Sequence, residues 1–338
     1  MRILIILNIG RTAFELGHYC KKAFEEMGHS VATFLYNDTR FSRRFHVLSG
    51  LEGYAATRML FSKIGYFRPD FIFIIKVDRL LCGTLNRIRQ RFKIPVVQYW
   101  IDDPYYIDVS RKISPCCDIF FTNDENCIET HRQSGAGDVR LMSFGCEPAL
   151  HNRLELNDEE KKYFGSEICF SGTLTQERLE VLEALAGFDI KIWAKKQYRV
   201  LCGNYRIEEK PVPQDSPVYS RLMGRDVWGL DMVKAFNASK IVLDIHTQDT
   251  PTMRDFEVPG CGGFLLSDHV RGLDKVFIPG KEIECFGSID ELKEKISHYL
   301  ENEDERKQIA DRGYIRAHRQ YTYKERMKQV MDALNEAG

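Results

Sequence analysis

Short apolar runs alternate with stretches of helical periodicity along the first half of the chain. The apolar runs expected to form strands are 2–7, 29–36, 70–75, 96–100 and 118–122. Between them lie segments with apolar residues every three or four positions, such as 12–27, which stops at Gly28, and 80–92. Strands that alternate with helices in this way predict a parallel sheet covered on both faces.

A second series of the same kind begins near residue 168. Its expected strands are 168–173, 189–194, 241–246 and 263–266, and its expected helices are 176–185, 227–237, 290–300, 304–318 and 322–334. A chain of 338 residues is also long for one hydrophobic core. The pattern therefore predicts an α/β protein with two domains. Segment 37–68, which is basic and aromatic, has no clear period and stays unassigned.

Composition excludes several classes of protein. No apolar run is long enough to span a membrane, and residues 1–7 read as a first strand, not as a signal peptide. No nucleic-acid-binding motif is present. Ten cysteines are scattered without a Cys-x-x-Cys pair, which favours neither a zinc site nor a redox motif and fits a reducing cytoplasm.

Charge is balanced over the whole chain but differs between its halves. The net charge is −1, whereas residues 1–150 hold 20 basic and 16 acidic residues. A basic face on this half could contact an acidic acceptor or the surface of a membrane. A solvated surface is the simpler explanation of so mild an asymmetry.

The stretch from Asp249 to Leu266 concentrates the candidate chemistry. A buried strand ends near His246, a short helix carries Arg254 and Glu257, and small residues follow before the next strand. A helix start at the carboxyl end of a parallel strand suits an anionic ligand. The Glu257 carboxylate could accept hydrogen bonds from two vicinal hydroxyls. The alternative is a surface ion pair between Arg254 and Glu257, which would contribute only about 0.3–0.5 kcal/mol.

The segment Met-Arg-Asp-Phe-Glu at 253–257, followed by Gly-Cys-Gly-Gly-Phe-Leu-Leu at 260–266, resembles the signature of the spore-maturation CgeB-like glycosyltransferases. The spacing of Asp249 and Glu257 also resembles the Glu-x7-Glu region of GT-B enzymes. The resemblance implies that Glu257 binds the donor ribose and that Asp249 lies near the donor sugar. Two departures are that Asp249 is one methylene shorter than Glu and that Thr252 stands where the family often has Asn.

The resemblance implies a GT-B fold, in which two Rossmann-like domains face each other across a cleft. Residues 1–147 together with a C-terminal helix at 321–338 would form the acceptor-side domain, with a hinge near Tyr321. Residues 148–320 would bind the donor. The segment 142–148, in which Gly145 precedes Glu147, is similar to the linker between the two domains.

Further donor contacts are expected in the second domain. Gly172 and Thr173 follow a strand and would approach the diphosphate through backbone N–H groups, with Arg178 as a neutralising cation. By resemblance, Trp193 would lie at the nucleotide-base pocket, and His246 could touch the donor. The alternatives are a solvated face for Arg178, the core for Trp193 and a structural role for His246.

In the first domain, Gly10 follows the first strand and is a candidate donor contact, or simply a turn that needs positive φ. The turn is not Gly-x-Gly-x-x-Gly, so a dinucleotide site is not indicated. Asp102 and Asp103 follow another strand, where one could act as general base. An Asp-Asp-Pro at this place also occurs in CgeB-like proteins. Alternatively, one of them caps a helix that starts near Tyr105, with Pro104 at its first position.

These features predict an enzyme that transfers a sugar from a nucleotide sugar, a uridine diphosphate sugar by preference, to an acceptor that is a glycan, a protein or a small molecule. Asp102 or Asp103, Asp249 and Arg254 are the candidate catalytic residues. No Asp-x-Asp is present, so we expect no metal site and no cofactor besides the nucleotide sugar. The Asp249 and Glu257 spacing favours retention of configuration. The alternatives are a nucleotide-sugar epimerase and a non-catalytic spore or cell-surface protein.

Overall fold

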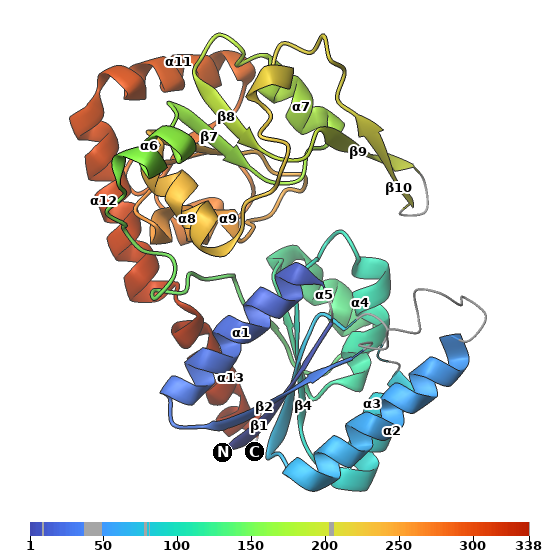
Figure 1. The fold of residues 1–338 in the computed structure, drawn as a ribbon. Helices are drawn as coiled ribbons and strands as arrows, with labels where there is room; N and C mark the ends of the chain where they lie inside the picture. Colours follow the sequence, from blue (N-terminus) through green and yellow to red (C-terminus); the bar gives the residue numbers. More distant parts are fainter. Residues whose placement is uncertain (9, 37–48, 78–79, 81, 203–205, 338) are drawn as a thin grey trace. The chain divides into compact units, whose positions relative to one another are not determined.

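The computed structural model describes residues 1–338 except 9, 37–48, 78–79, 81, 203–205 and 338 (Figure 1). It contains two compact units. The first consists of Met1–Phe144 and Tyr323–Gly338, and the second of Gly145–Thr322. The sequence-based boundaries, 147 and 321, lie three and two residues from these positions. The two chain segments that join the units run side by side. The Cys146 N–H donates to the Tyr321 carbonyl at 2.7 Å, and Cys146 forms an isolated parallel β-bridge with Thr322.

The first unit is built on a six-stranded parallel sheet in the order β2-β1-β3-β4-β5-β6. Its strands are β1 (Arg2–Leu7), β2 (Ser30–Leu35), β3 (Phe71–Ile75), β4 (Val96–Trp100), β5 (Ile119–Thr122) and β6 (Val139–Leu141). Its helices are α1 (Arg11–Glu26), α2 (Ser49–Phe67), α3 (Cys82–Phe92), α4 (Ile107–Ile113), α5 (Ile128–Gln133) and α13 (Tyr323–Ala337). The central strands β3 and β4 are buried along their whole length, as apolar runs in a doubly covered parallel sheet must be.

The second unit has a five-stranded parallel sheet in the order β13-β12-β11-β7-β8 and a separate antiparallel pair, β9 and β10. The strands are β7 (Ile168–Ser171), β8 (Ile190–Trp193), β9 (Gln197–Cys202), β10 (Arg206–Pro211), β11 (Ile241–Asp244), β12 (Leu265–Asp268) and β13 (Glu284–Phe286). The helices are α6 (Asp158–Phe164), α7 (Gln176–Glu183), α8 (Gly229–Ala238), α9 (Arg254–Gly260), α10 (Leu273–Val276), α11 (Ile289–Glu301) and α12 (Glu303–Gln320).

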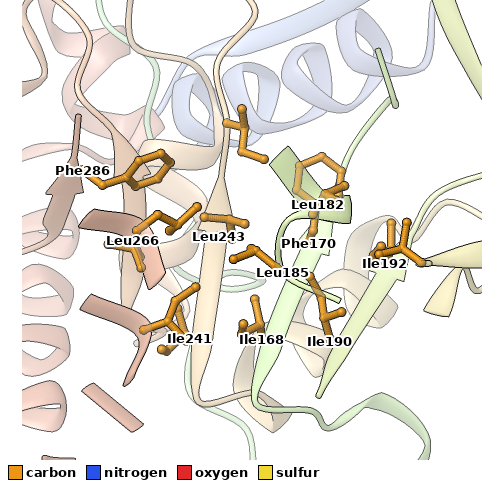
Figure 2. Close-up of a cluster of buried hydrophobic side chains, with 14 of the residues drawn as sticks. Ile168, Phe170, Leu182, Leu185, Ile190, Ile192, Ile241, Leu243, Leu266 and Phe286 are labelled. Carbon is orange, nitrogen blue, oxygen red and sulfur yellow. The ribbon is translucent and has the colours of Figure 1, made fainter. Parts of the chain in front are cut away.

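One continuous core holds the second unit together. Side chains from β7, β8 and β11, among them Phe170, Ile192 and Leu243, meet Leu182 and Leu185 from the α7 segment (Figure 2). This packing fixes the carboxyl ends of β7 and β11 side by side, and the candidate donor residues follow those two strands.

The cysteines correct one expectation from the sequence. Cys82 and Cys116 form a disulfide between the start of α3 and the short helical turn Ser114–Cys116, whereas the sequence suggested only thiols. Among the described residues, seven other cysteines are buried thiols that form no disulfide: Cys20, Cys117, Cys127, Cys146, Cys169, Cys261 and Cys285.

Candidate functional site

Arg178 ties the turn after β7 to the end of β11. Its Nε donates to the Ile245 carbonyl at 2.7 Å, and its Nη1 donates to the Thr173 carbonyl at 2.8 Å. The Thr175 hydroxyl caps α7 by accepting the Arg178 N–H at 3.3 Å. Burial lowers the pKa of Arg178, while the carboxylates of Asp244 and Asp268 act in the opposite direction. The predicted alternative of a solvated helix face for Arg178 is therefore wrong.

Gly172 lies directly against this arginine. A Cβ added to Gly172 would come within 3.5 Å of Arg178 Nη1 and of the Phe170 ring. Gly172, Thr173 and Arg178 therefore form one unit at the carboxyl end of β7, where the sequence placed the diphosphate turn.

Arg254 and Glu257 form a buried ion pair in the first turn of α9. The side chain of Glu257 is only 5% exposed and that of Arg254 is 17% exposed. Arg254 Nε also donates to the Ser171 carbonyl at 3.1 Å, and its guanidinium lies 5.3 Å from the centre of the Phe236 ring. The predicted alternative of an ion pair on the helix surface is wrong, because helix α8 and the end of β7 enclose this one.

His151 is a second neighbour of Glu257, and the sequence analysis missed it. Its Nδ1 accepts the Glu147 N–H at 2.9 Å, so the ring proton resides on Nε2. Nε2 lies 4.0 Å from Glu257 Oε1, and His151 is fully buried. Burial lowers the pKa of His151, although the Glu257 carboxylate acts to raise it, and the ring is therefore neutral at pH 7. The one signal in the sequence was its place four residues after Glu147 in the linker motif.

His246 sits inside a group of carboxylates. Its Nε2 lies 2.8 Å from Asp255 Oδ2, and its Nδ1 lies 2.6 Å from Asp268 Oδ1. Burial alone would lower the pKa of His246, but the carboxylates of Asp255 and Asp244 and the hydrogen bonds to Asp255 and Asp268 together raise it to about 11. The side chain is 1% exposed. The ring is therefore an imidazolium that holds β11, α9 and β12 together, which favours the structural alternative over contact with the donor.

Three side chains of this group could also hold a metal ion. Donor atoms of Asp244, His246 and Asp255 lie within 4.8 Å of one another, the one such group among the described residues. The 2.8 Å separation of His246 Nε2 and Asp255 Oδ2 is the length of a charged hydrogen bond. A shared proton therefore accounts for the geometry.

Trp193 belongs to the core. It is completely buried in β8, and its ring centre lies 5.4 Å from that of Phe164 in α6. Its buried side chain agrees with the alternative that placed it in the core, whereas the expectation that the backbone after β8 lines a nucleotide-base pocket stays a prediction. The chain beyond β8 enters the β9–β10 hairpin, and a recess of about 30 Å³ there is lined by Thr173, Leu174, Lys195, Gln197, Arg199, Glu209 and Asp226.

Asp249 lies apart from the Arg254–Glu257 pair. It accepts the Arg271 N–H at 2.8 Å and pairs with the Arg271 guanidinium, and its side chain is 53% exposed. The hydrogen bond from the Arg271 backbone, with the Arg271 side chain, lowers the pKa of Asp249. No ion pair joins Asp249 to Arg254 within the described part of the chain.

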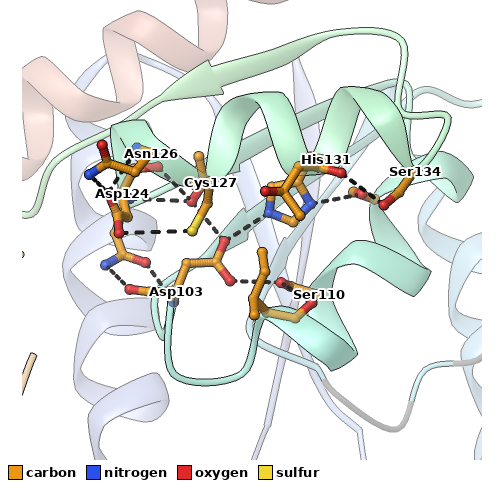
Figure 3. Close-up of polar contacts among 12 residues, drawn as sticks. Asp103, Ser110, Asp124, Asn126, Cys127, His131 and Ser134 are labelled. Carbon is orange, nitrogen blue, oxygen red and sulfur yellow. Dashed lines mark hydrogen bonds and ion pairs between the residues drawn. The ribbon is translucent and has the colours of Figure 1, made fainter.

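In the first unit, Asp103 is fully buried and both its carboxylate oxygens are occupied (Figure 3). Oδ1 accepts from the Ser110 hydroxyl at 2.6 Å, while Oδ2 accepts from the Thr122 hydroxyl at 2.7 Å and lies 2.9 Å from His131 Nε2. Asp103 therefore anchors the loop after β4 and is withdrawn as a candidate general base. Asp102 makes a different contact: its side chain is about one-quarter exposed and pairs with Lys76 at the end of β3.

Two smaller expectations for this unit are also wrong. Helix α4 is preceded by Tyr106, without a side-chain cap, so neither aspartate caps it, and the Asp103–Pro104 peptide is cis. Gly10 precedes α1 with φ −60°, so it does not need the left-handed region that the turn was expected to require. Gly10 is exposed, and a Cβ there would meet nothing within 4 Å.

A cavity of about 560 Å³ in the first unit lies away from these residues. It is lined by Pro95 and Ile119, which stand at the beginnings of β4 and β5. Asp102 follows the other end of β4. The cavity therefore occupies the opposite edge of the sheet from the candidate residues.

Comparison with known proteins supports the class of glycosyltransferases. A family model described as "Glycosyl transferase-like" matches residues 176–332. The Spore protein CgeB of Bacillus subtilis is 22% identical over 279 residues, which cover 78% of this chain and 82% of CgeB. These two matches confirm the resemblance to the CgeB-like glycosyltransferases that the segment 253–266 indicated.

Solved structures share the fold across the whole chain. Sucrose-phosphate synthase from Thermosynechococcus elongatus matches with a TM-score of 0.69 at 14% identity and covers 100% of both chains. Anabaena HepE in complex with UDP-glucose matches with a TM-score of 0.69 at 13% identity, over 99% of this chain and 100% of that one. The fold is GT-B, with two Rossmann-like units. No described helix combines the length and the apolar character that crossing a membrane requires.

Proposed function

We propose that the protein transfers a sugar from a nucleotide sugar, by preference a uridine diphosphate sugar, to an acceptor that is a glycan, a protein or a small molecule. The second unit binds the donor and the first binds the acceptor. The family match supports a glycosyltransferase, and the solved neighbour HepE, which contains UDP-glucose, favours uridine. We further place this activity in the cytoplasm.

The Arg254–Glu257 pair is the observation that carries the proposal. Glu257 Oε2 is held by Arg254, while Oε1 faces His151 at 4.0 Å and keeps lone pairs for ligand hydroxyls. A ribose that donates to this oxygen would form charged hydrogen bonds of about 1.5–3 kcal/mol each. Arg254 and Arg178 would stabilise the charge that develops on the departing diphosphate, together with the backbone N–H groups of Gly172 and Thr173.

In the first unit, Asp102 would take the proton of the acceptor hydroxyl as general base. Its pairing with Lys76 places the carboxylate at the carboxyl edge of the sheet. Asp249 would lie near the donor sugar, and Gly10 would contact the donor from the first unit. The Asp249 and Glu257 spacing leads us to propose a retaining reaction that needs no metal ion.

Two other functions share the fold. A putative UDP-N-acetylglucosamine 2-epimerase from Listeria monocytogenes matches with a TM-score of 0.62 at 11% identity, over 98% of this chain and 95% of that one, which keeps an epimerase as the second candidate. A non-catalytic spore or cell-surface protein is the third. Product analysis with donor alone separates an epimerase from a transferase, because only the epimerase yields an epimerised sugar, whereas a transferase at most hydrolyses the donor.

Thermal shifts with a panel of nucleotides and nucleotide sugars test the donor site. A ligand at about 100 times its Kd should stabilise the native protein by roughly 2.7 kcal/mol. Glu257→Gln keeps the side-chain volume and should strongly reduce the shift, whereas Glu167→Gln, at a partly exposed carboxylate beside Lys240, should leave it unchanged. If no nucleotide shifts the wild-type melting temperature, the donor-site proposal fails.

A further inference from the structure

Helices α2 and α3 of the first unit present an outward face that combines cations with uncovered apolar side chains. We call it the cationic face and define it as Arg58, Met59, Lys63, Tyr66, Arg87 and Arg91. The two helices lie side by side (Figure 1), and the ring centres of Phe61 and Phe92 are 5.6 Å apart between them.

The packing of α2 explains why these side chains point outward. Ala56, Leu60 and Ile64 are buried, four residues apart, and so face the sheet. The opposite side of the helix then carries Met59 and Tyr66, seven residues apart, which are 60% and 86% exposed. Exposed methionine and tyrosine on one stripe of a helix are apolar surface that no described residue of the first unit covers.

The charge of this region is one-sided. Residues 55–93 contain nine arginines and lysines but only two aspartates. Arg58, Lys63 and Arg87 make no ion pair with any residue that the structure describes, whereas Arg89 pairs with Asp118. The Arg91 guanidinium lies 5.9 Å from the centre of the Phe61 ring, so it bridges α2 and α3 on the same side.

We propose that the cationic face docks the protein on an anionic lipid bilayer. The unpaired cations complement the charge of anionic headgroups. Met59 and Tyr66 fit the same partner, because an apolar side chain and an amphipathic ring on a helix enter the boundary between headgroups and acyl chains. A soluble polyanion would satisfy the arginines alone and would leave these two side chains without a role.

The test uses the full chain and vesicles of phosphatidylcholine, with or without about 30% phosphatidylglycerol. The wild type should co-sediment with the anionic vesicles and not with the neutral ones, and added salt should weaken binding. Arg58→Gln/Arg87→Gln should lower the partition coefficient at least tenfold. Met59→Ser/Tyr66→Ser should lower it several-fold. Arg132→Gln/Arg319→Gln removes the same charge from exposed positions on α5 and α12 and should leave binding unchanged.

Three results would overturn the proposal. The first is a wild-type protein that ignores anionic vesicles, and the second is an equal loss in the Arg132/Arg319 control, which would mean non-specific attraction. The third is that soluble polyphosphate abolishes vesicle binding while the Met59/Tyr66 variant binds as well as the wild type. This result would assign the cationic face to a soluble polyanion. Far-UV circular dichroism and melting temperature verify that each surface variant is folded. None of these readouts depends on glycosyl transfer.

Discussion

Glu257 has a different neighbour at each carboxylate oxygen. Arg254 holds Oε2, and the Nε2–H of His151 faces Oε1 at 4.0 Å. The arginine fixes the position of the carboxylate, while the longer separation from His151 leaves Oε1 open to hydroxyl donors. In the proposed donor site His151 would therefore be a positioning residue, because it would act on a ligand only through Glu257.

Removing the His151 donor should weaken nucleotide binding and leave the chemical step alone. We expect His151→Phe to raise the Kd of a nucleoside diphosphate by roughly three- to tenfold, as the loss of one weak polar neighbour would. Isothermal titration with wild type, His151→Phe, Glu257→Gln and the double variant measures the coupling. The matched control is His131→Phe, at another fully buried histidine, which should lower stability without changing the Kd. Additive effects at His151 and Glu257 would contradict a positioning role.

His246 gives folding stability a dependence on pH. Its pKa is raised from 6.5 to about 11 in the native protein, so the native state keeps a proton that the unfolded chain loses. The stabilisation is complete below about pH 6.5 and is lost as pH rises towards 11. The free energy of unfolding should fall over this window, by about 1.4 kcal/mol per pH unit at most. Urea denaturation at several pH values measures it, and His246→Gln should flatten the slope. An equal slope in both proteins would contradict an imidazolium at this position.

At the scale of elements, α9 packs so closely on the linker that its last residue must be glycine. A Cβ at Gly260 would stand 2.6 Å from Cys146 Cβ and 3.3 Å from His151 Cβ. The same approach brings His151 up to Glu257, so the packing of the helix and the geometry of the site have one cause.

Gly260→Ala should therefore destabilise the protein by about 1–3 kcal/mol, as overpacking does, and should also weaken nucleotide binding. Gly65→Ala is the matched control, because Gly65 is helical in α2 and a Cβ there meets nothing within 4 Å. That change should be neutral or should stabilise by about 0.5–1 kcal/mol. Chemical denaturation of both variants measures the difference, and equal effects would mean that the linker yields to the added methyl group.

Elements with a continuous apolar run or a clear helical period could be predicted from sequence, and those with neither could not. Strands such as β3 and β4 are buried on both faces, so their runs of Ile, Val and Phe identify them. Strands β9 and β10 were missed because they lie outside the five-stranded parallel sheet, and charged residues such as Arg199 and Glu209 interrupt their pattern. Helix α2 was missed because its outward Met59 and Tyr66 blur the apolar period.

The candidate site was likewise predicted only in part. Gly172, Thr173, Arg178, Arg254 and Glu257 were placed at neighbouring strand ends by chain order alone, since parallel strands end at one edge. Partners from distant segments could not be found that way. The donors to Asp103 include Thr122 and His131, 19 and 28 residues further along the chain, and no local pattern links them to Asp103. Which aspartate of an adjacent pair turns inward is settled by such contacts.

On the scale of the whole molecule, we propose that the arginines and helix starts of the proposed donor site take the place of a metal ion. We expect glycosyl transfer to continue with EDTA present, because the diphosphate charge would be stabilised by Arg178 and Arg254. A radiolabelled donor assay with and without chelator measures this. Loss of turnover that added Mn²⁺ or Mg²⁺ restores would contradict the metal-independent mechanism and would direct attention to Asp244, His246 and Asp255.

The chain passes between the two units twice, near Cys146 and near Thr322, and this has a consequence for how the protein is synthesised. Residues 145–322 form the whole second unit as one uninterrupted stretch, whereas the first unit is completed only by α13. The Tyr323 ring stacks on Tyr19 of α1 at 5.2 Å, and Arg326 donates to the Ser143 hydroxyl at 2.5 Å. Because a chain leaves the ribosome from its N-terminus, the first unit begins synthesis first but waits longest for its last helix. The nascent chain therefore finishes its second unit while Tyr19 is still uncovered.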